Sequence, residues 1–87
     1  MLHIIKNKAG LEAASVFLSS QDELILIEEA SYLTKLCSES ITERSFVLLE
    51  DLLARGINKE QVASCEVVDF SGFVRLTERH DSSLTWE

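Results

Sequence analysis

Four short apolar runs recur along the chain with helix-like segments between them, and this alternation most limits the possible folds. The runs do not alternate apolar with polar residues, which is typical of strands covered on both faces of a parallel sheet. We therefore predict an α/β fold in three layers, with a four-stranded parallel sheet between helices. The runs are LHII (2–5), ELILIEE (23–29), SFVLLE (45–50) and CEVVD (65–69).

The segments between these runs have apolar residues at helical spacing, which predicts helices on both faces of the sheet. Gly56 is placed to end the third helix, because glycine readily adopts the conformation that closes a helix. In the last helix, Phe70, Phe73 and Val74 are expected to face the sheet. Right-handed crossovers between parallel strands favour a flavodoxin-like strand order, 2-1-3-4. The predicted helices span residues 11–20, 29–37, 50–56 and 71–80.

Length and composition indicate one globular domain, residues 1–87. The chain has no proline and only three glycines, so no linker is expected, and 46% of its residues are hydrophobic. A domain this small buries a modest share of its surface, and we therefore expect it to be sheltered in an oligomer.

Charge and hydropathy exclude two classes of partner. The formal net charge of −7 gains nothing from phosphate contacts, so direct nucleic-acid binding is not expected. The longest uninterrupted apolar run, LILI, is too short to span a membrane, and the start MLHIIKNK lacks the order of charges that a signal peptide has. We therefore expect a cytoplasmic protein.

Acidic residues follow three of the four predicted strands. Neither GxGxxG nor GxxxxGKS/T occurs at the strand ends, so no nucleotide cofactor is expected. The carboxylates suit a divalent metal or a cationic partner. However, each precedes a predicted helix, so capping of helix N-termini is the favoured interpretation and no metal is expected. These ends, where open parallel sheets bind ligands, are Lys6–Lys8, Glu28–Glu29, Glu50–Asp51 and Asp69–Gly72.

The two cysteines, Cys37 and Cys65, match neither a zinc pattern nor a CxxC redox motif. Cys37 lies at the end of a predicted helix or in the loop that follows, and it is the candidate catalytic thiol. An activated thiolate needs a helix N-terminus or a nearby cation, and Cys37 is at the opposite end of its helix. A role as a small apolar filler is therefore favoured for Cys37, and core packing for Cys65.

The closing stretch DFSGFVRLTERHDSSLTW (69–86) contains Asp69, His80 and Asp81, which together suggest an acid–base site. Adjacent residues on a helix do not face each other, however. His80 near the helix C-terminus interacts favourably with the helix dipole, and Asp81 suits the turn that follows. A structural role for these residues is the favoured interpretation.

Three residues are expected to contact a partner: Trp86, Phe73 and His3. Trp86 is the chain's only tryptophan, and a large aromatic side chain near a chain end either packs back on its own domain or is buried by a neighbour. The sequence leaves these two outcomes open. His3 is expected to be a hydrogen-bonded histidine at the sheet edge or at an interface rather than a metal ligand.

Several segments together resemble one family, the TusB/DsrH family of small sulfur-relay subunits. They are the start MLHII, the run ELILIEE, the segment LLEDLLARGI and the end VVDFSGFVRLTERHDSSLTW. The resemblance covers nearly the whole chain. Its most specific part is LEDLLARG followed later by VDFSGFVRLTERH and a terminal tryptophan.

The resemblance implies a DsrE-like fold and assembly with two sister subunits of the same fold into a hetero-hexamer. It implies a complex that carries persulfide sulfur, toward 2-thiolation of wobble uridine in tRNA or, in the Dsr branch, in sulfur oxidation. The main sulfur-accepting cysteine belongs to a sister subunit, and sulfur-carrier proteins are the other partners. Some members also carry a cysteine in the first helix, at a position that matches Ala14 here. The resemblance thus implies a docking subunit that is not catalytic by itself.

Two alternatives stay open beside this interpretation. The chain could be a stand-alone thiol sulfurtransferase that uses Cys37, which predicts rapid alkylation of that thiol near neutral pH. It could also be a homodimeric binding protein that has left the relay, with Trp86 or an apolar helix face in its interface.

Overall fold

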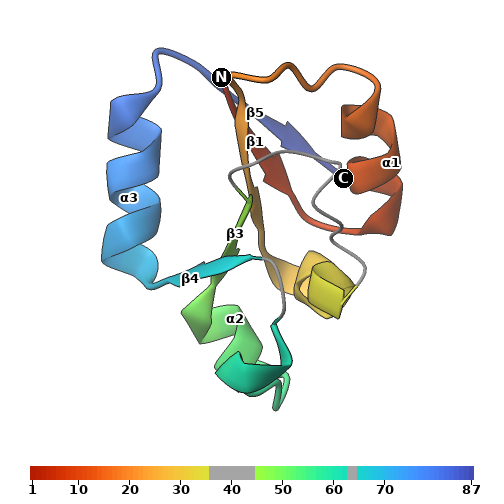
Figure 1. Ribbon diagram of the computed structural model, residues 1–87, viewed down its shortest axis with the longest axis vertical. Helices are drawn as coiled ribbons and strands as arrows, with labels where there is room; N and C mark the ends of the chain where they lie inside the picture. Colours follow the sequence, from red (N-terminus) through yellow and green to blue (C-terminus); the bar gives the residue numbers. More distant parts are fainter. Residues whose placement is uncertain (36–44, 63–64) are drawn as a thin grey trace.

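A computed structural model describes residues 1–35, 45–62 and 65–87, and it has helices on both faces of a parallel sheet (Figure 1). The predicted α/β architecture is therefore confirmed. The second helical segment is a 3-10 helix, η1, rather than an α-helix. In chain order the elements are β1 (Leu2–Ile5), α1 (Lys8–Ser15), β2 (Glu23–Leu26), η1 (Glu28–Lys35), β3 (Ser45–Leu48), α2 (Leu49–Ala54), η2 (Lys59–Gln61), β4 (Glu66–Val68), α3 (Phe70–Arg79) and β5 (Ser83–Trp86).

The sheet has five strands in the order β4-β3-β2-β1-β5, so the predicted count of four and the predicted order 2-1-3-4 are both wrong. The additional strand is β5, which pairs in parallel with β1 from Leu2↔Ser83 to Ile5↔Trp86. Its four residues include threonine and tryptophan, which favour strands. Four residues are too few for their apolar pattern to distinguish a strand from a turn. Pairing with β1 decides the conformation of this segment.

The handedness of the crossovers explains which helices lie on which face. The steps from β1 to β4 all move in one direction across the sheet, so right-handed crossovers place α1, η1 and α2 on the same face. The chain then returns from β4 to β5 in the opposite direction, which places α3 on the other face (Figure 1). The direction reverses between β1 and β5. Among the helices that the structure describes, none is long and apolar enough to cross a membrane.

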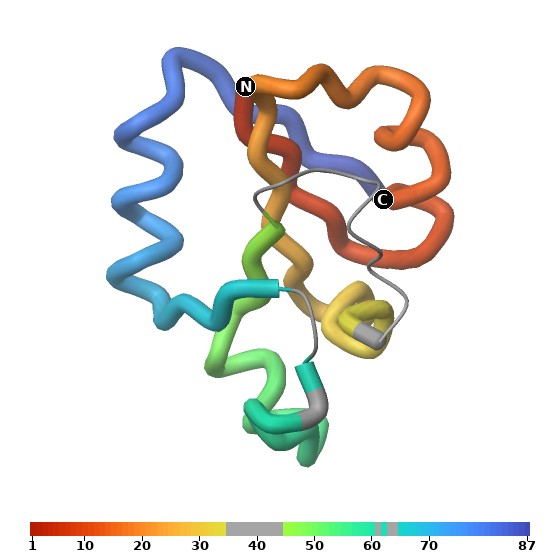
Figure 2. Tube along the Cα trace, viewed as in Figure 1, coloured from red at the N-terminus to blue at the C-terminus, as the bar shows by residue number. Residues whose placement is uncertain are grey.

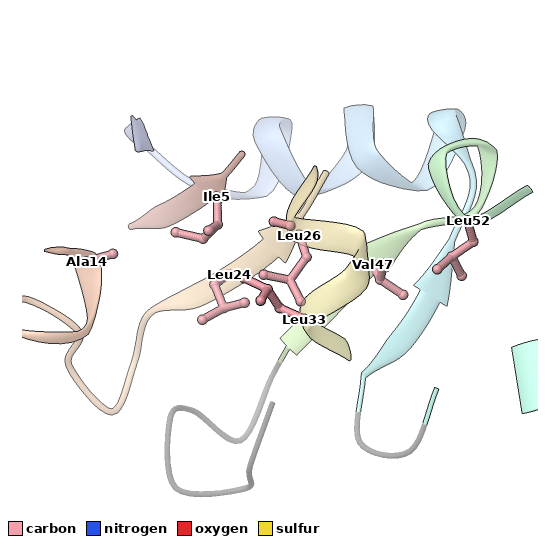
Figure 3. Packing of buried hydrophobic residues seen from close by; sticks show 8 residues of the cluster. Ile5, Ala14, Leu24, Leu26, Leu33, Val47 and Leu52 are labelled. Atoms are coloured by element: carbon pink, nitrogen blue, oxygen red, sulfur yellow. The ribbon is translucent and has the colours of Figure 1, made fainter. Parts of the chain in front are cut away.

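The core on the face of α1 and η1 joins alternate residues of the central strands to three helices (Figure 3). The strands supply four large aliphatic side chains, and the helices supply two leucines and two alanines. Both faces of β1, β2 and β3 are covered, which is why their sequences are continuously apolar. The buried members are Ile5, Leu24, Leu26 and Val47 from the strands and Ala14, Ala30, Leu33 and Leu52 from the helices.

The core on the opposite face depends on α3 alone, and its contacts differ from those predicted. Leu76 carries the burial, with 4% of its surface exposed, and Phe73 packs beside it at the edge of the cluster. Phe70 is 61% exposed and Val74 is also exposed, so the expectation that they face the sheet is wrong. Phe73 and Leu76, at spacing i, i+3, therefore face the sheet, while Phe70 and Val74 point away from it.

Two helix boundaries follow the sequence signals. Asp69 caps the start of α3, where its Oδ1 accepts a hydrogen bond from the Gly72 amide at 2.8 Å. Gly56 follows α2 with φ of +67°, and the next amide, of Ile57, donates to the Leu52 carbonyl at 3.0 Å. The predicted helix-ending role of Gly56 is therefore confirmed.

Gly10 lets α1 approach the end of β5 closely. A Cβ atom on Gly10 would lie 2.6 Å from the backbone oxygen of Trp86 and 2.8 Å from its carbonyl carbon. Those atoms belong to the backbone of a paired strand, so they cannot rotate out of the way. Glycine at this position is therefore required by packing, although the residue lies inside a helix.

Gly10→Ala is expected to lower the free energy of unfolding by about 1–3 kcal/mol, the usual cost of overpacking. Alanine inside a helix normally stabilises it relative to glycine by about 0.5–1 kcal/mol, so the sign of the change tests the contact. Urea unfolding followed by circular dichroism measures it. Ala13→Gly, at an exposed position of α1, calibrates the helix propensity term. A gain in stability for Gly10→Ala would contradict the close approach.

Candidate functional site

His3, in β1, joins the last strand to the loop before β2 through hydrogen bonds at both of its ring nitrogens. The indole Nε1–H of Trp86 donates to His3 Nδ1 at 3.0 Å, and His3 Nε2 lies 2.9 Å from Oδ2 of Asp22. Because Nδ1 accepts a hydrogen bond, Nε2 must carry the proton and donate it to the carboxylate. The side chain is 1% exposed, and the two hydrogen bonds fix the orientation of its ring.

Asp22 accepts further hydrogen bonds where the N-terminus lies beside the segment that leads into β2 (Figure 2). The amine of Met1 donates to its Oδ1 at 3.1 Å, and the Ser19 amide donates to its Oδ2 at 3.2 Å. Burial acts to raise the pKa of Asp22, but the hydrogen bonds from His3, Ser19 and the Met1 amine outweigh it and hold the pKa well below its usual range. The carboxylate is therefore ionised at neutral pH.

Trp86 packs back on its own domain and stays partly exposed. Its ring stacks against His3 with a centroid distance of 6.1 Å and against Phe17, in the loop after α1, with a distance of 5.6 Å. A pocket of about 450 Å³, hereafter the β5 pocket, opens beside this group of rings. It is lined mainly by the apolar side chains of Met1, Phe17, Leu84 and Trp86, with His3, Ser19 and Asp22 as its polar members.

A buried carboxylate, Glu23, fastens the end of α3 to the opposite face of the sheet. Arg79 Nη2 lies 2.6 Å and 2.7 Å from its two carboxylate oxygens, and His80 Nε2 lies 2.6 Å from Oε1. A buried carboxylate is costly unless it is paired in this way. Asp69 precedes α3 and His80 follows it, so the structure does not bring Asp69, His80 and Asp81 together as an acid–base site.

The acidic residues at the carboxyl ends of the strands accept hydrogen bonds from backbone amides. Asp51 Oδ2 accepts from the Glu28 amide at 2.7 Å, and Glu50 Oε2 accepts from the first amide of α3 at 3.2 Å. Glu28 has a positive φ of 51°, a conformation that costs a non-glycine residue free energy and that this hydrogen bond helps to hold. Asp51 and Glu50 thus bind the first amides of η1 and α3, whereas α2, the helix that they were expected to cap, has no side-chain cap. In the described part of the chain, no three histidine, cysteine or acidic side chains are arranged to hold a metal.

Two cations lie among these carboxylates. Lys6 Nζ lies 3.1 Å from Glu87 and 3.3 Å from Glu28, and these carboxylates raise the pKa of the Lys6 ammonium above its usual value. Arg55 lies 3.7 Å from Glu29 and also stacks over the ring of Tyr32. This edge of the sheet therefore remains acidic but is partly neutralised.

Of the two cysteines, Cys37 lies outside the described residues. Cys65 is partly buried and packs against the α1-face core, while Phe73 packs against the core of the opposite face. Ala14, at the position where the sequence resemblance implies a cysteine in some family members, is completely buried.

The sequence did not point to Asp22, Glu23 or Phe17. In the structure Asp22 binds His3 and Glu23 binds His80. The one available signal was a pair of acidic residues directly before a buried strand, where carboxylates need partners. Which partners they take depends on the strand order, which the sequence did not determine.

Comparison with known proteins connects this arrangement to a family. Residues 6–83 match the family model described as DsrH like protein. The chain belongs to the DsrH family. Within this family it is 32% identical to Protein TusB of Shigella flexneri, over 97 aligned positions that cover 99% of this chain and 100% of the relative. Protein TusB of Escherichia coli (strain K12) matches with the same identity and coverage. The TusB/DsrH resemblance of the sequence is confirmed.

A solved structure shares the DsrH-family fold found here. The solution NMR structure of protein Tm0979 from Thermotoga maritima superimposes with a TM-score of 0.71, over 94% of this chain and 97% of that chain. At 17% identity the likeness concerns the fold alone.

Trp86→Phe is expected to lower the free energy of unfolding by about 1–3 kcal/mol, because it keeps a ring but leaves the buried Nδ1 of His3 without a donor. Phe17→Leu is the matched control, since it removes a stacked ring and no hydrogen bond. Its expected cost is smaller, about 0.5–1 kcal/mol. Urea unfolding followed by circular dichroism compares the two. Equal costs would show that the hydrogen bond contributes nothing beyond ring packing.

Asp22→Asn is expected to destabilise the protein most at neutral pH and progressively less in acid. A carboxylate whose pKa is lowered by folding stabilises the fold above its unfolded pKa of about 4 and loses that contribution as the pH falls further. Urea unfolding at pH 7 and at about pH 3 measures the difference between wild type and variant at each pH. Asp81→Asn, at an exposed position, is the control. A difference for Asp22→Asn that is the same at both pH values would refute the assignment.

Proposed function

We propose that the chain is a docking subunit of a sulfur-relay complex, in which the cysteine of a sister subunit carries persulfide sulfur for 2-thiolation of wobble uridine in tRNA. The observation that carries this proposal is the full-length match to the DsrH family and to proteins named TusB. The name TusB favours the tRNA branch of the relay over the sulfur-oxidising branch.

Two separated apolar patches support a docking role. One lies on α3 and consists of the exposed Phe70 and Val74 with the partly buried Phe73 against Phe70, and the other surrounds Trp86 near β5. Exposed apolar patches on a small protein commonly mark contacts with other proteins, and two patches suit a subunit with two neighbours. Phe73 and Trp86 are the proposed contact residues. His3 is buried, so its proposed part is to hold Trp86 in place.

The chemistry in the proposed complex belongs to the sister subunit. Its thiolate attacks the outer sulfur of the donor's persulfide, the sulfur–sulfur bond of the donor breaks, and the donor cysteine leaves as a thiolate. The transfer needs no oxidant or reductant. This chain has Ala14 where some family members have a cysteine, and its Cys65 is partly buried, which supports a positional role.

Purification of the tagged chain from its source cell, under native conditions, is expected to yield two small DsrE-like subunits in stoichiometric amounts. Sulfur transfer within this complex, followed with a radiolabelled persulfide donor, should mark a cysteine of a sister subunit. The chain with both Cys37→Ser and Cys65→Ser should support this labelling to within about twofold, since substitutions away from a reacting site have small effects.

Other results would favour the alternatives. A stand-alone thiol sulfurtransferase predicts that Cys37→Ser abolishes sulfur uptake and that Cys37 alkylates faster than an ordinary thiol near neutral pH. A homodimeric binding protein predicts a dimer of this chain with no sister subunit. Either result would contradict the docking role.

A further inference from the structure

We propose that the outer edge of β5 receives a β-strand from a sister subunit, so that the sheet continues from one protein into the next. This inference rests on the proposed function for the identity of the partner, and it assigns the contact to a particular strand. Addition of a strand to an exposed sheet edge is a common mode of recognition, in which backbone hydrogen bonds supply affinity and alternate side chains supply specificity.

The outer side of β5 presents backbone groups that pair with no strand in the described part of the chain. The carbonyl oxygens of Ser82 and Trp86 accept hydrogen bonds from the β1 side, from the amides of Leu2 and Lys6. In a parallel pair the residues bond alternately to the two sides, so Ser83 and Thr85 direct their amide and carbonyl groups outward. Within residues 1–35, 45–62 and 65–87, no strand pairs with that side.

β5 also lacks the features that usually protect an edge strand from pairing. Its sequence, SLTW, has no charge and no proline, and its register with β1 runs without a bulge. The strand at the other edge, β4, differs from β5 in both length and charge. It has three residues and begins with the exposed Glu66. The contrast indicates that the β5 edge is kept open for a partner.

The β5 pocket lies where the side chains of an added strand would reach. Leu84 and Trp86 line the pocket, and residues of a strand paired with β5 would lie directly beside them on the same face. A pocket of about 450 Å³ accommodates a large aliphatic or aromatic side chain. The added strand is therefore expected to carry a large apolar residue at an alternate position.

Charge argues for a sister subunit rather than a second copy as the occupant. The chain carries a formal net charge of −7, and β5 lies between Asp81 and Glu87. Lys6 is shared between Glu87 and Glu28, so it does not neutralise both. A second copy would bring these carboxylates against each other, whereas a strand with basic flanking residues would complement them.

Hydrogen exchange resolved to single amides tests the pairing in the isolated chain and in the complex purified with it. Ser83 and Thr85 are expected to exchange rapidly in isolation and at least about tenfold more slowly in the complex, as paired strand amides do. Leu84→Lys, at a side chain that is 45% exposed, should weaken the complex by about tenfold or more. Leu53→Lys on α2, at a 67% exposed position, makes the same change away from β5 and should leave affinity within about twofold.

The outcomes separate this inference from the proposed function. If sister subunits are recovered but the exchange of Ser83 and Thr85 is unchanged, strand addition is overturned and the docking role stands. If those amides are protected in a dimer of this chain alone, the sister subunit is overturned as the occupant. If no sister subunit is recovered, the proposed function fails and the partner assigned to β5 fails with it. Thermal unfolding of both lysine variants confirms that the comparison concerns folded proteins.

Discussion

The hydrogen bond from the Trp86 indole to His3 fixes the last strand of the sheet, and the surface proposed for docking depends on it. β5 has four residues and one neighbouring strand, so backbone pairing alone holds it weakly. The indole bond anchors the end of β5 to a buried ring that Asp22 orients in turn. Gly10 then allows α1 to close over the Trp86 backbone.

Two neighbouring carboxylates attach the chain's last segments to opposite faces of the sheet. Asp22 holds the His3 ring that binds Trp86, while Glu23 holds Arg79 and His80 at the end of α3. Neighbouring residues at a strand point to opposite faces, which is why two adjacent acids serve two different contacts. Together they fix the end of α3 and the end of β5.

The sequence predicted the elements better than their arrangement. The apolar run Leu2–Ile5 matches β1 in both bounds, and Gly56 ends its helix as expected, because these features depend on local patterns. β5 was missed because Ser83–Trp86 becomes a strand through pairing with β1, a contact between the two ends of the chain. The partners of His3 and His80 were missed for the same reason, since they depend on strand order. In α3, periodicity predicted an apolar stripe through Phe70, Phe73 and Val74, whereas packing buries Leu76 with Phe73 beside it.

The central claim is that His3 acts as a fixed acceptor for Trp86, and nitrogen-15 NMR of the histidine side chains tests it most directly. At neutral pH the account predicts His3 with the proton on Nε2, an unprotonated Nδ1, and a Trp86 indole proton that exchanges slowly with solvent. A proton on Nδ1, or rapid exchange of the indole proton, would contradict it, because β5 would then lack the anchor on which the docking edge depends.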